Sequence, residues 1–199
     1  MDQRTTATRL TRAAAGLLTI VAFSTVSAAP ASGAQPANRP AGQGPEPAQT
    51  VTIHLDPAGS DENDGTAARP VRSLARAKQV LADPENADTT SATILVRPGT
   101  YYESAVVSWN GIPPRTLAIR RDGEAGRPVF DGRRATGSSH YWMNTAGGPS
   151  LDVRGLLVRN YRTGGIRLDT DGNTVRNMIF ERIGNKHVPD GPGYAALHL

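Results

Sequence analysis

The stretch V-R-G-L-L-V-R-N at residues 153–160 returns 22 residues later as V-R-N-M-I-F-E-R at 175–182. The apolar positions and the arginine match, and Gly155 aligns with Asn177. Gly and Asn are the residues that most readily adopt a left-handed backbone, so the alignment predicts the same bend in both copies. A period in the twenties with short strands is typical of a solenoid, in which each repeat pairs in parallel with the next.

The rest of the chain fits this architecture. Short apolar runs are separated by Pro-Gly, Asp-Gly and Gly-Gly, which is typical of strands joined by corners. The runs lie at 94–96, 105–107, 116–119, 128–130 and 156–158. One helix is predicted over 73–83, because Ser73 is a suitable N-cap and Asp83-Pro84 ends the run.

Residues 1–34 have the parts of a secretory signal peptide. Arginines come first, an apolar stretch follows at 13–29, and small residues at 32–34 supply a cleavage site. Ser and Thr interrupt the apolar stretch, which is also shorter than the roughly 20 residues that a membrane span needs. We therefore expect an extracellular protein that has no membrane association after the signal peptide is cleaved.

The remainder divides into a linker and one domain. Residues 35–50 carry four prolines and no large apolar residue, which predicts a disordered linker, and alternating apolar residues from Val51 open a domain at 51–199. The 199-residue chain has no cysteine, so an apolar core or a repetitive stack must stabilise it. Its net charge of +4 includes three arginines of the leader, and no basic stripe indicates a nucleic acid partner.

Four consecutive motifs carry a family resemblance. They are H-L-D-P-A-G-S-D-E-N-D-G-T (54–66), R-P-V-R-S-L-A-R-A (69–77), T-I-L-V-R-P-G-T-Y-Y-E (93–103) and T-L-A-I-R-R-D-G-E-A-G-R-P-V-F-D-G (116–132). This succession resembles the N-terminal part of secreted β-helix proteins of the pectin-lyase-like superfamily, especially its polysaccharide-lyase type. The resemblance implies an all-β, right-handed parallel β-helix whose first coil is covered by an N-terminal capping helix.

The resemblance also implies a carbohydrate-active protein that acts on or binds an acidic polysaccharide, as a monomer. The alternative is a non-catalytic β-helix module that binds polysaccharide or has a structural role. If the protein is an enzyme, we expect a lyase rather than a glycoside hydrolase, because the sequence lacks the Asp-Asp pair and the G-H-G motif of hydrolases with this fold.

An insertion in one coil carries the candidate catalytic residues. If 165–168 matches 196–199, extra residues project from the solenoid as a loop at 185–193, and solenoid binding faces are often built from such loops. Elimination needs a base, a cation and an acid. The candidates are Lys186, His187, Asp190 and, on the preceding coil, Arg162. An ordinary solvated loop is the alternative interpretation.

Three further residues are candidates for substrate binding. Arg154 and Arg176 are expected to stack one coil apart, near the spacing of neighbouring strands, where they could follow anionic sugar units. Tyr161 is expected at a corner close to the loop. A solvated face with Glu181 as the partner of the arginines is the alternative.

No metal or other cofactor is required by the sequence, and calcium is possible without direct support. The acidic loop at 56–66 departs from an EF-hand, because Gly65 falls fifth from Asp61 rather than sixth. A turn whose Asp and Asn side chains bond their own backbone is the expected structure. The sequence stops at Leu199 within an expected strand, so we expect a fragment of a longer β-helix protein.

Overall fold

The computed structural model describes residues 49–136, 141–184 and 195–198. These described residues all belong to one compact unit. The predicted signal peptide at 1–34 and nearly all of the predicted linker at 35–50 lie outside the described residues. Within the described ranges, no helix is long and apolar enough to cross a membrane.

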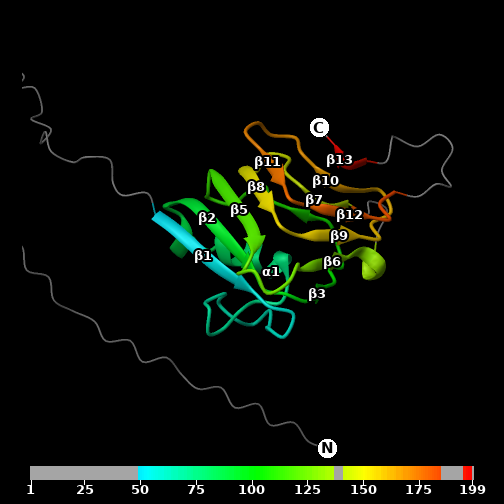
Figure 1. Ribbon diagram of the computed structural model, residues 1–199. Helices are drawn as coiled ribbons and strands as arrows, with labels where there is room; N and C mark the ends of the chain where they lie inside the picture. Colours follow the sequence, from blue (N-terminus) through cyan, green and yellow to red (C-terminus); the bar gives the residue numbers. More distant parts are fainter. Residues whose placement is uncertain (1–48, 137–140, 185–194, 199) are drawn as a thin grey trace, which may run out of the picture. The chain divides into compact units, whose positions relative to one another are not determined.

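The strands form three parallel sheets (Figure 1). In spatial order, sheet A contains β1 (Gln49–Leu55), β2 (Thr89–Val96), β5 (Thr116–Arg121), β8 (Ser150–Arg154) and β11 (Thr174–Arg176). Sheet B contains β12 (Ile179–Glu181), β9 (Leu157–Arg159), β6 (Val129–Asp131) and β3 (Thr100–Tyr101). Sheet C contains β13 (Ala195–His198), β10 (Gly164–Arg167), β7 (Tyr141–Asn144) and β4 (Val107–Ser108).

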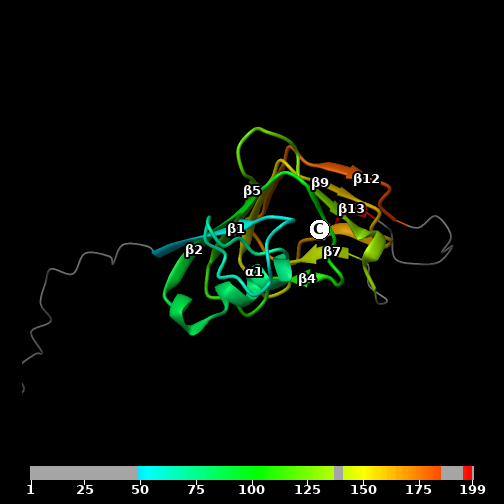
Figure 2. The same ribbon diagram turned by 90° about the horizontal axis from the view of Figure 1, so that it is seen from below.

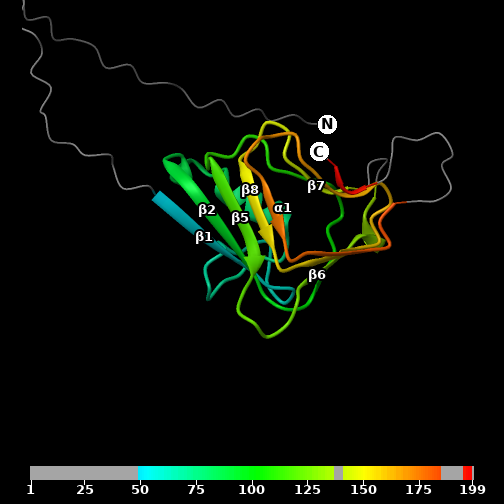
Figure 3. The same ribbon diagram turned by 45° about the horizontal axis from the view of Figure 1, so that its top comes forward.

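From β2 onward, each coil contributes one strand to each sheet before the chain moves to the next coil, whereas the first coil contributes only β1. The successive coils are seen stacked side by side in Figure 3. Every pairing between strands is parallel. The predicted fold class, a right-handed parallel β-helix with an N-terminal capping helix, is confirmed.

The register confirms the internal repeat. Val153 lies opposite Val175, and Val158 lies opposite Phe180. Gly155 and Asn177 both have positive φ, 77° and 51°, as the alignment predicted for the shared bend. The predicted match of the last coil is confirmed as well, because Ile166 pairs with Leu197.

The core lies between the three sheets, filled by the inward-facing residue of each strand. In sheet A, Ile94, Ile119 and Val153 occupy matching positions on neighbouring strands and are fully buried. Burying each such side chain contributes about 1.5–3 kcal/mol, so a repeated column of them stabilises the stack without disulfides. Aromatic rings continue the core, with the centroid of Phe130 at 4.7 Å from that of Trp142.

The single α-helix of the described residues, α1 (Leu74–Leu81), lies beside β1 at the N-terminal end of the stack (Figure 2). The Ser73 side chain accepts a hydrogen bond from the Arg76 backbone N–H at 3.0 Å, as expected of an N-cap. Leu74, Ala77 and Leu81 are buried, so the helix covers the first coil with its apolar face. Two short 3-10 helices, η1 (Pro84–Asn86) and η2 (Gly132–Arg134), complete the secondary structure of these ranges.

The acidic loop is a set of turns, as predicted. The Asp56 carboxylate accepts from the backbone N–H of Ala58 at 2.8 Å, and that of Asp64 accepts from Thr66 at 3.1 Å. Asp61 instead reaches across to the start of α1. Among the described residues, no group of three or more His, Asp or Glu side chains could hold a metal ion.

Candidate functional site

A row of three arginines runs across the outer face of sheet A. Arg120 lies opposite Arg154, and Arg154 lies opposite Arg176, on three adjacent strands. Each arginine directly follows a core residue, so the alternation of a β-strand places its side chain outside. Neighbouring strands are about 4.8 Å apart, so the row repeats a positive charge at that interval.

The row lines a surface hollow of about 520 Å³, which we call the arginine groove. The next residue along β5, Arg121, and the following turn complete it. The lining residues are Leu95, Arg120, Arg121, Gly123, Glu124, Arg154, Gly155, Arg176 and Asn177. None of these lining residues is aromatic, and four of the nine carry a positive charge.

Two carboxylates contact the groove arginines. The Asp152 carboxylate oxygen Oδ2 lies 3.8 Å from Nε of Arg154 and 3.6 Å from Nη2 of Arg176, and Glu124 pairs with Arg121. In the part of the chain that the structure describes, Arg120 forms no ion pair or side-chain hydrogen bond. The groove therefore keeps an excess of positive charge.

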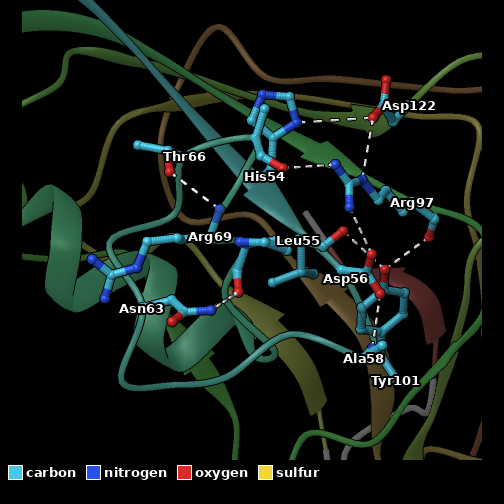
Figure 4. A network of polar contacts seen from close by, with 12 residues as sticks. His54, Leu55, Asp56, Ala58, Asn63, Thr66, Arg69, Arg97, Tyr101 and Asp122 are labelled. Atoms are coloured by element: carbon cyan, nitrogen blue, oxygen red, sulfur yellow. Dashed lines mark hydrogen bonds and ion pairs between the residues drawn. The ribbon is translucent and has the colours of Figure 1, made fainter.

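A polar network holds the first coil at one end of the same outward row (Figure 4). Nη1 of Arg97 donates to Oδ2 of Asp56 at 2.8 Å, and this bond lowers the pKa of Asp56. Asp122 Oδ2 lies 3.9 Å from both Nε of Arg97 and Nδ1 of His54. Because Asp122 directly precedes the Gly123 turn, the network also fixes the start of the loop that lines the groove.

The predicted catalytic residues are not assembled by the described part of the chain. Lys186, His187 and Asp190 lie outside the described residues. Arg162 is exposed after β9, at the corner between sheets B and C, whereas the arginine groove lies on sheet A. The arrangement in space of the four candidates therefore stays a prediction.

The substrate-binding candidates have mixed outcomes. Arg154 and Arg176 stack one coil apart, as predicted, although their partner is Asp152 rather than Glu181. Tyr161 lies at the predicted corner after β9, but its side chain is fully buried in the core and so cannot contact a polymer at the surface. The corner after β9 turns this ring inward, and burial raises the pKa of its hydroxyl.

Arg120 and Arg121 of the arginine groove, and Asp152 beside it, are absent from the set predicted from sequence. The sequence pattern that could have identified them is an apolar strand that ends in arginine, as in L-A-I-R-R at 117–121 and L-D-V-R at 151–154. More residues separate Ile119 from Val153 than separate Val153 from Val175. The spacing of the internal repeat therefore does not align the strand of Arg120 with that of Arg154.

Stacked parallel coils with a helical cap and a basic outer face define the class of the molecule as a parallel β-helix protein. No protein-family model matches the chain. Over 68 residues it is 32% identical to the uncharacterized protein YwoF of Bacillus subtilis (strain 168), a match that covers 34% of this chain and 13% of that protein. The chain thus spans a small part of that protein's length.

A solved structure with a similar fold is a rhamnogalacturonan lyase. It matches with a TM-score of 0.47 and 22% sequence identity, over 59% of this chain and 32% of that chain. A likeness at this level says nothing about activity.

Proposed function

We propose that this chain is an exported, carbohydrate-active β-helix protein that binds an acidic polysaccharide along the arginine groove. The observation that carries the proposal is the in-register row of Arg120, Arg154 and Arg176. A polymer with one carboxylate on each sugar unit presents charges at a regular interval of similar size. A row of cations at strand spacing complements such a polymer better than it complements a single small anion.

The chemistry of the groove favours a carboxylate ligand. A guanidinium group can bind a carboxylate through two parallel hydrogen bonds, which a neutral sugar cannot replace. The absence of aromatic rings among the lining residues disfavours single-stranded nucleic acid, whose bases need stacking platforms. The signal peptide predicted at 1–34 supports a partner found outside the cell.

The groove is exposed, so each ion pair with the polymer contributes about 1 kcal/mol or less. Useful affinity must therefore come from several contacts made by one chain, and it must fall as salt screens the charges. Asp152 reduces the mutual repulsion of Arg154 and Arg176, but its single negative charge leaves the pair positively charged.

Binding to polygalacturonate and alginate, which carry one carboxylate on each sugar unit, with neutral dextran as the reference, tests the proposal. We expect affinity electrophoresis of the full mature protein to show retardation by the acidic polymers alone. The triple substitution of Arg120, Arg154 and Arg176 to Ala should abolish it, whereas Arg167→Ala, which changes a half-exposed arginine of sheet C, should not. Equal retardation of the triple variant and the wild type would contradict the proposal.

A lyase activity is the second candidate, supported by Arg120, which no carboxylate of the described residues engages in the groove. In β-elimination a base removes the proton on the carbon that bears the uronate carboxylate. The electron pair of that C–H bond forms a carbon–carbon double bond as the bond from the neighbouring carbon to the glycosidic oxygen breaks, and this oxygen takes up a proton. A cation on the carboxylate stabilises the intermediate charge. The base and acid would come from the predicted set of Lys186, His187, Asp190 and Arg162.

The ultraviolet absorbance of the unsaturated product separates the two candidates. Lysis that falls by orders of magnitude in Lys186→Ala or His187→Ala would support the enzyme. Binding with no unsaturated product on either acidic polymer would support a non-catalytic module.

A further inference from the structure

A second hollow lies at the helical cap, on the side of the first coil where sheet B begins. Its volume is about 580 Å³, within the usual range for small-ligand sites, and it shares no lining residue with the arginine groove. The residues that matter here are Asp61, Arg72, Tyr102, Glu103 and Arg134, and we call it the cap pocket.

Arg134 and Tyr102 form one wall of the cap pocket. The guanidinium carbon of Arg134 lies 4.1 Å from the centre of the Tyr102 ring, and Tyr102 is 40% exposed. In the part of the chain that the structure describes, Arg134 has no ion pair, whereas its neighbour Arg133 is engaged by Asp131. A guanidinium that stacks on an aromatic ring keeps its N–H edge free, and that edge matches a carboxylate.

Two carboxylates also line the cap pocket. Glu103 is 3% exposed, and its Oε1 accepts a hydrogen bond from the Leu74 backbone N–H at 2.7 Å. The Asp61 Oδ1 accepts from the backbone N–H groups of Arg72 at 3.1 Å and Ser73 at 2.9 Å. The start of α1 therefore fixes both carboxylates in place. A carboxylate has about four acceptor sites, so each group retains capacity for further donors.

We propose that the cap pocket binds a sugar acid as a small ligand, with its carboxylate on Arg134 and its hydroxyl groups on Glu103 and Asp61. The lining groups need opposite properties from one molecule: an anionic group for the free guanidinium and hydrogen-bond donors for the carboxylates. A neutral sugar would leave Arg134 without an anionic partner. A ligand that also carried anionic groups in place of its hydroxyl groups would be repelled by the carboxylates of Glu103 and Asp61.

Glu103 gives the site a dependence on pH. Burial raises the pKa of Glu103 to about 7, against the opposing effect of the hydrogen bond from Leu74. Below that pH the Glu103 carboxyl is neutral, so it no longer repels the carboxylate of the ligand and can itself donate a hydrogen bond. Binding should therefore tighten as the pH falls from about 8 to about 6.

Titration calorimetry with galacturonate, and with galactose as the neutral control, tests the proposal on the full protein. We expect galacturonate to bind and galactose to bind at least about tenfold more weakly, as the loss of a charge-assisted pair predicts. Arg134→Ala should cause a similar loss of galacturonate affinity. Arg134 and Tyr102 are exposed, so Arg134→Ala and Tyr102→Ala should keep the melting temperature of the wild type.

Two further variants distinguish the cap pocket from the arginine groove and test the role of Glu103. The triple alanine variant of the arginine groove should bind galacturonate like the wild type, whatever happens to its polymer binding. Glu103→Gln should remove the pH dependence of binding, which a purely structural Glu103 would not do. No galacturonate binding by the wild type, or unchanged binding by Arg134→Ala, would overturn the proposal.

Discussion

Arg154 stands directly opposite Arg176 in the parallel ladder between β8 and β11, and both side chains reach the same Asp152 carboxylate. Like charges on directly opposed strand positions destabilise a sheet unless something separates or compensates them. Asp152, two residues before Arg154 on the same face of the sheet, supplies that compensation. One carboxylate thus compensates two guanidinium groups, so this part of the groove stays positively charged and still attracts an anionic ligand.

Asp152→Asn should strengthen the binding of acidic polymers several-fold at low salt. The substitution keeps the shape of the side chain and removes one negative charge beside the groove, and the gain should shrink as salt increases. Affinity electrophoresis at low and high ionic strength measures it. Asp169→Asn is the matched control, because Asp169 pairs with Arg167 at 3.0 Å on sheet C. Weaker binding by Asp152→Asn would show that Asp152 is needed to position the arginines.

The stability of the protein should fall as the pH rises from about 5 to about 7, in part because of Glu103. Its pKa is raised from 4.5 to about 7 by burial, so in this window the unfolded chain loses the proton while the folded protein keeps it. Above pH 7 the cost to the free energy of unfolding is about 3 kcal/mol.

Glu103→Gln removes that titration and keeps an acceptor for the Leu74 N–H. Urea unfolding at pH 5 and pH 8 should show a smaller difference for this variant than for the wild type. Glu85→Gln, an exposed change in η1, is the control and should leave the difference unaltered. An equal pH dependence in Glu103→Gln and the wild type would contradict the role of Glu103.

Asp131→Asn should destabilise the fold by about 3–5 kcal/mol, the usual cost of removing one partner from a buried ion pair. The Asp131 side chain is fully buried, and its carboxylate accepts from Arg133 at 2.8 Å, Arg159 at 2.9 Å and Asn160 at 2.8 Å. Burial by itself would raise its pKa, but these bonds outweigh burial and lower it.

The sign of the pH effect is opposite to that of Glu103. Because the pKa of Asp131 is lowered, its stabilisation is complete above pH 3.8 and is lost only in stronger acid. Urea unfolding at pH 7 measures the loss in Asp131→Asn. Asp122→Asn, whose carboxylate is 37% exposed and whose contacts with Arg97 and His54 are 3.9 Å long, should cost under about 1 kcal/mol.

The coil architecture could be predicted from sequence because neighbouring coils repeat the same requirements. The same spacing separates the core residues Val153 and Val175 and the left-handed bends at Gly155 and Asn177. This common spacing predicts the register in which the two strands pair. The earlier coils differ in length, so Arg120 could not be aligned with Arg154 before the strands were paired.

Side-chain direction at the corners could not be predicted. Tyr161 follows a strand and lies at a turn, a position that favours an outward side chain, yet its side chain is buried in the core. Corner residues are not bound to the alternation of a strand, so neighbouring residue types alone do not fix their direction.

Tyr101 and Tyr102 show the same problem in adjacent residues and allow a matched experiment. The Tyr101 ring is buried, stacked on Phe130 at 5.0 Å, and its hydroxyl lies 2.8 Å from the Arg97 carbonyl and 3.1 Å from the Leu55 carbonyl. Tyr102 is exposed in the cap pocket. The first hydroxyl therefore ties the corner to β1, and the second does not.

Tyr101→Phe should lower the free energy of unfolding by about 1–2 kcal/mol, because the Leu55 and Arg97 carbonyl groups lose the one hydroxyl donor they share while the aromatic stack is kept. Tyr102→Phe, the same chemical change one residue later, should stay within about 0.5 kcal/mol of the wild type. Urea unfolding of both variants at one pH gives the comparison. Equal losses would mean that the Tyr101 hydroxyl does not hold the first coil, and the corner would then depend on ring packing alone.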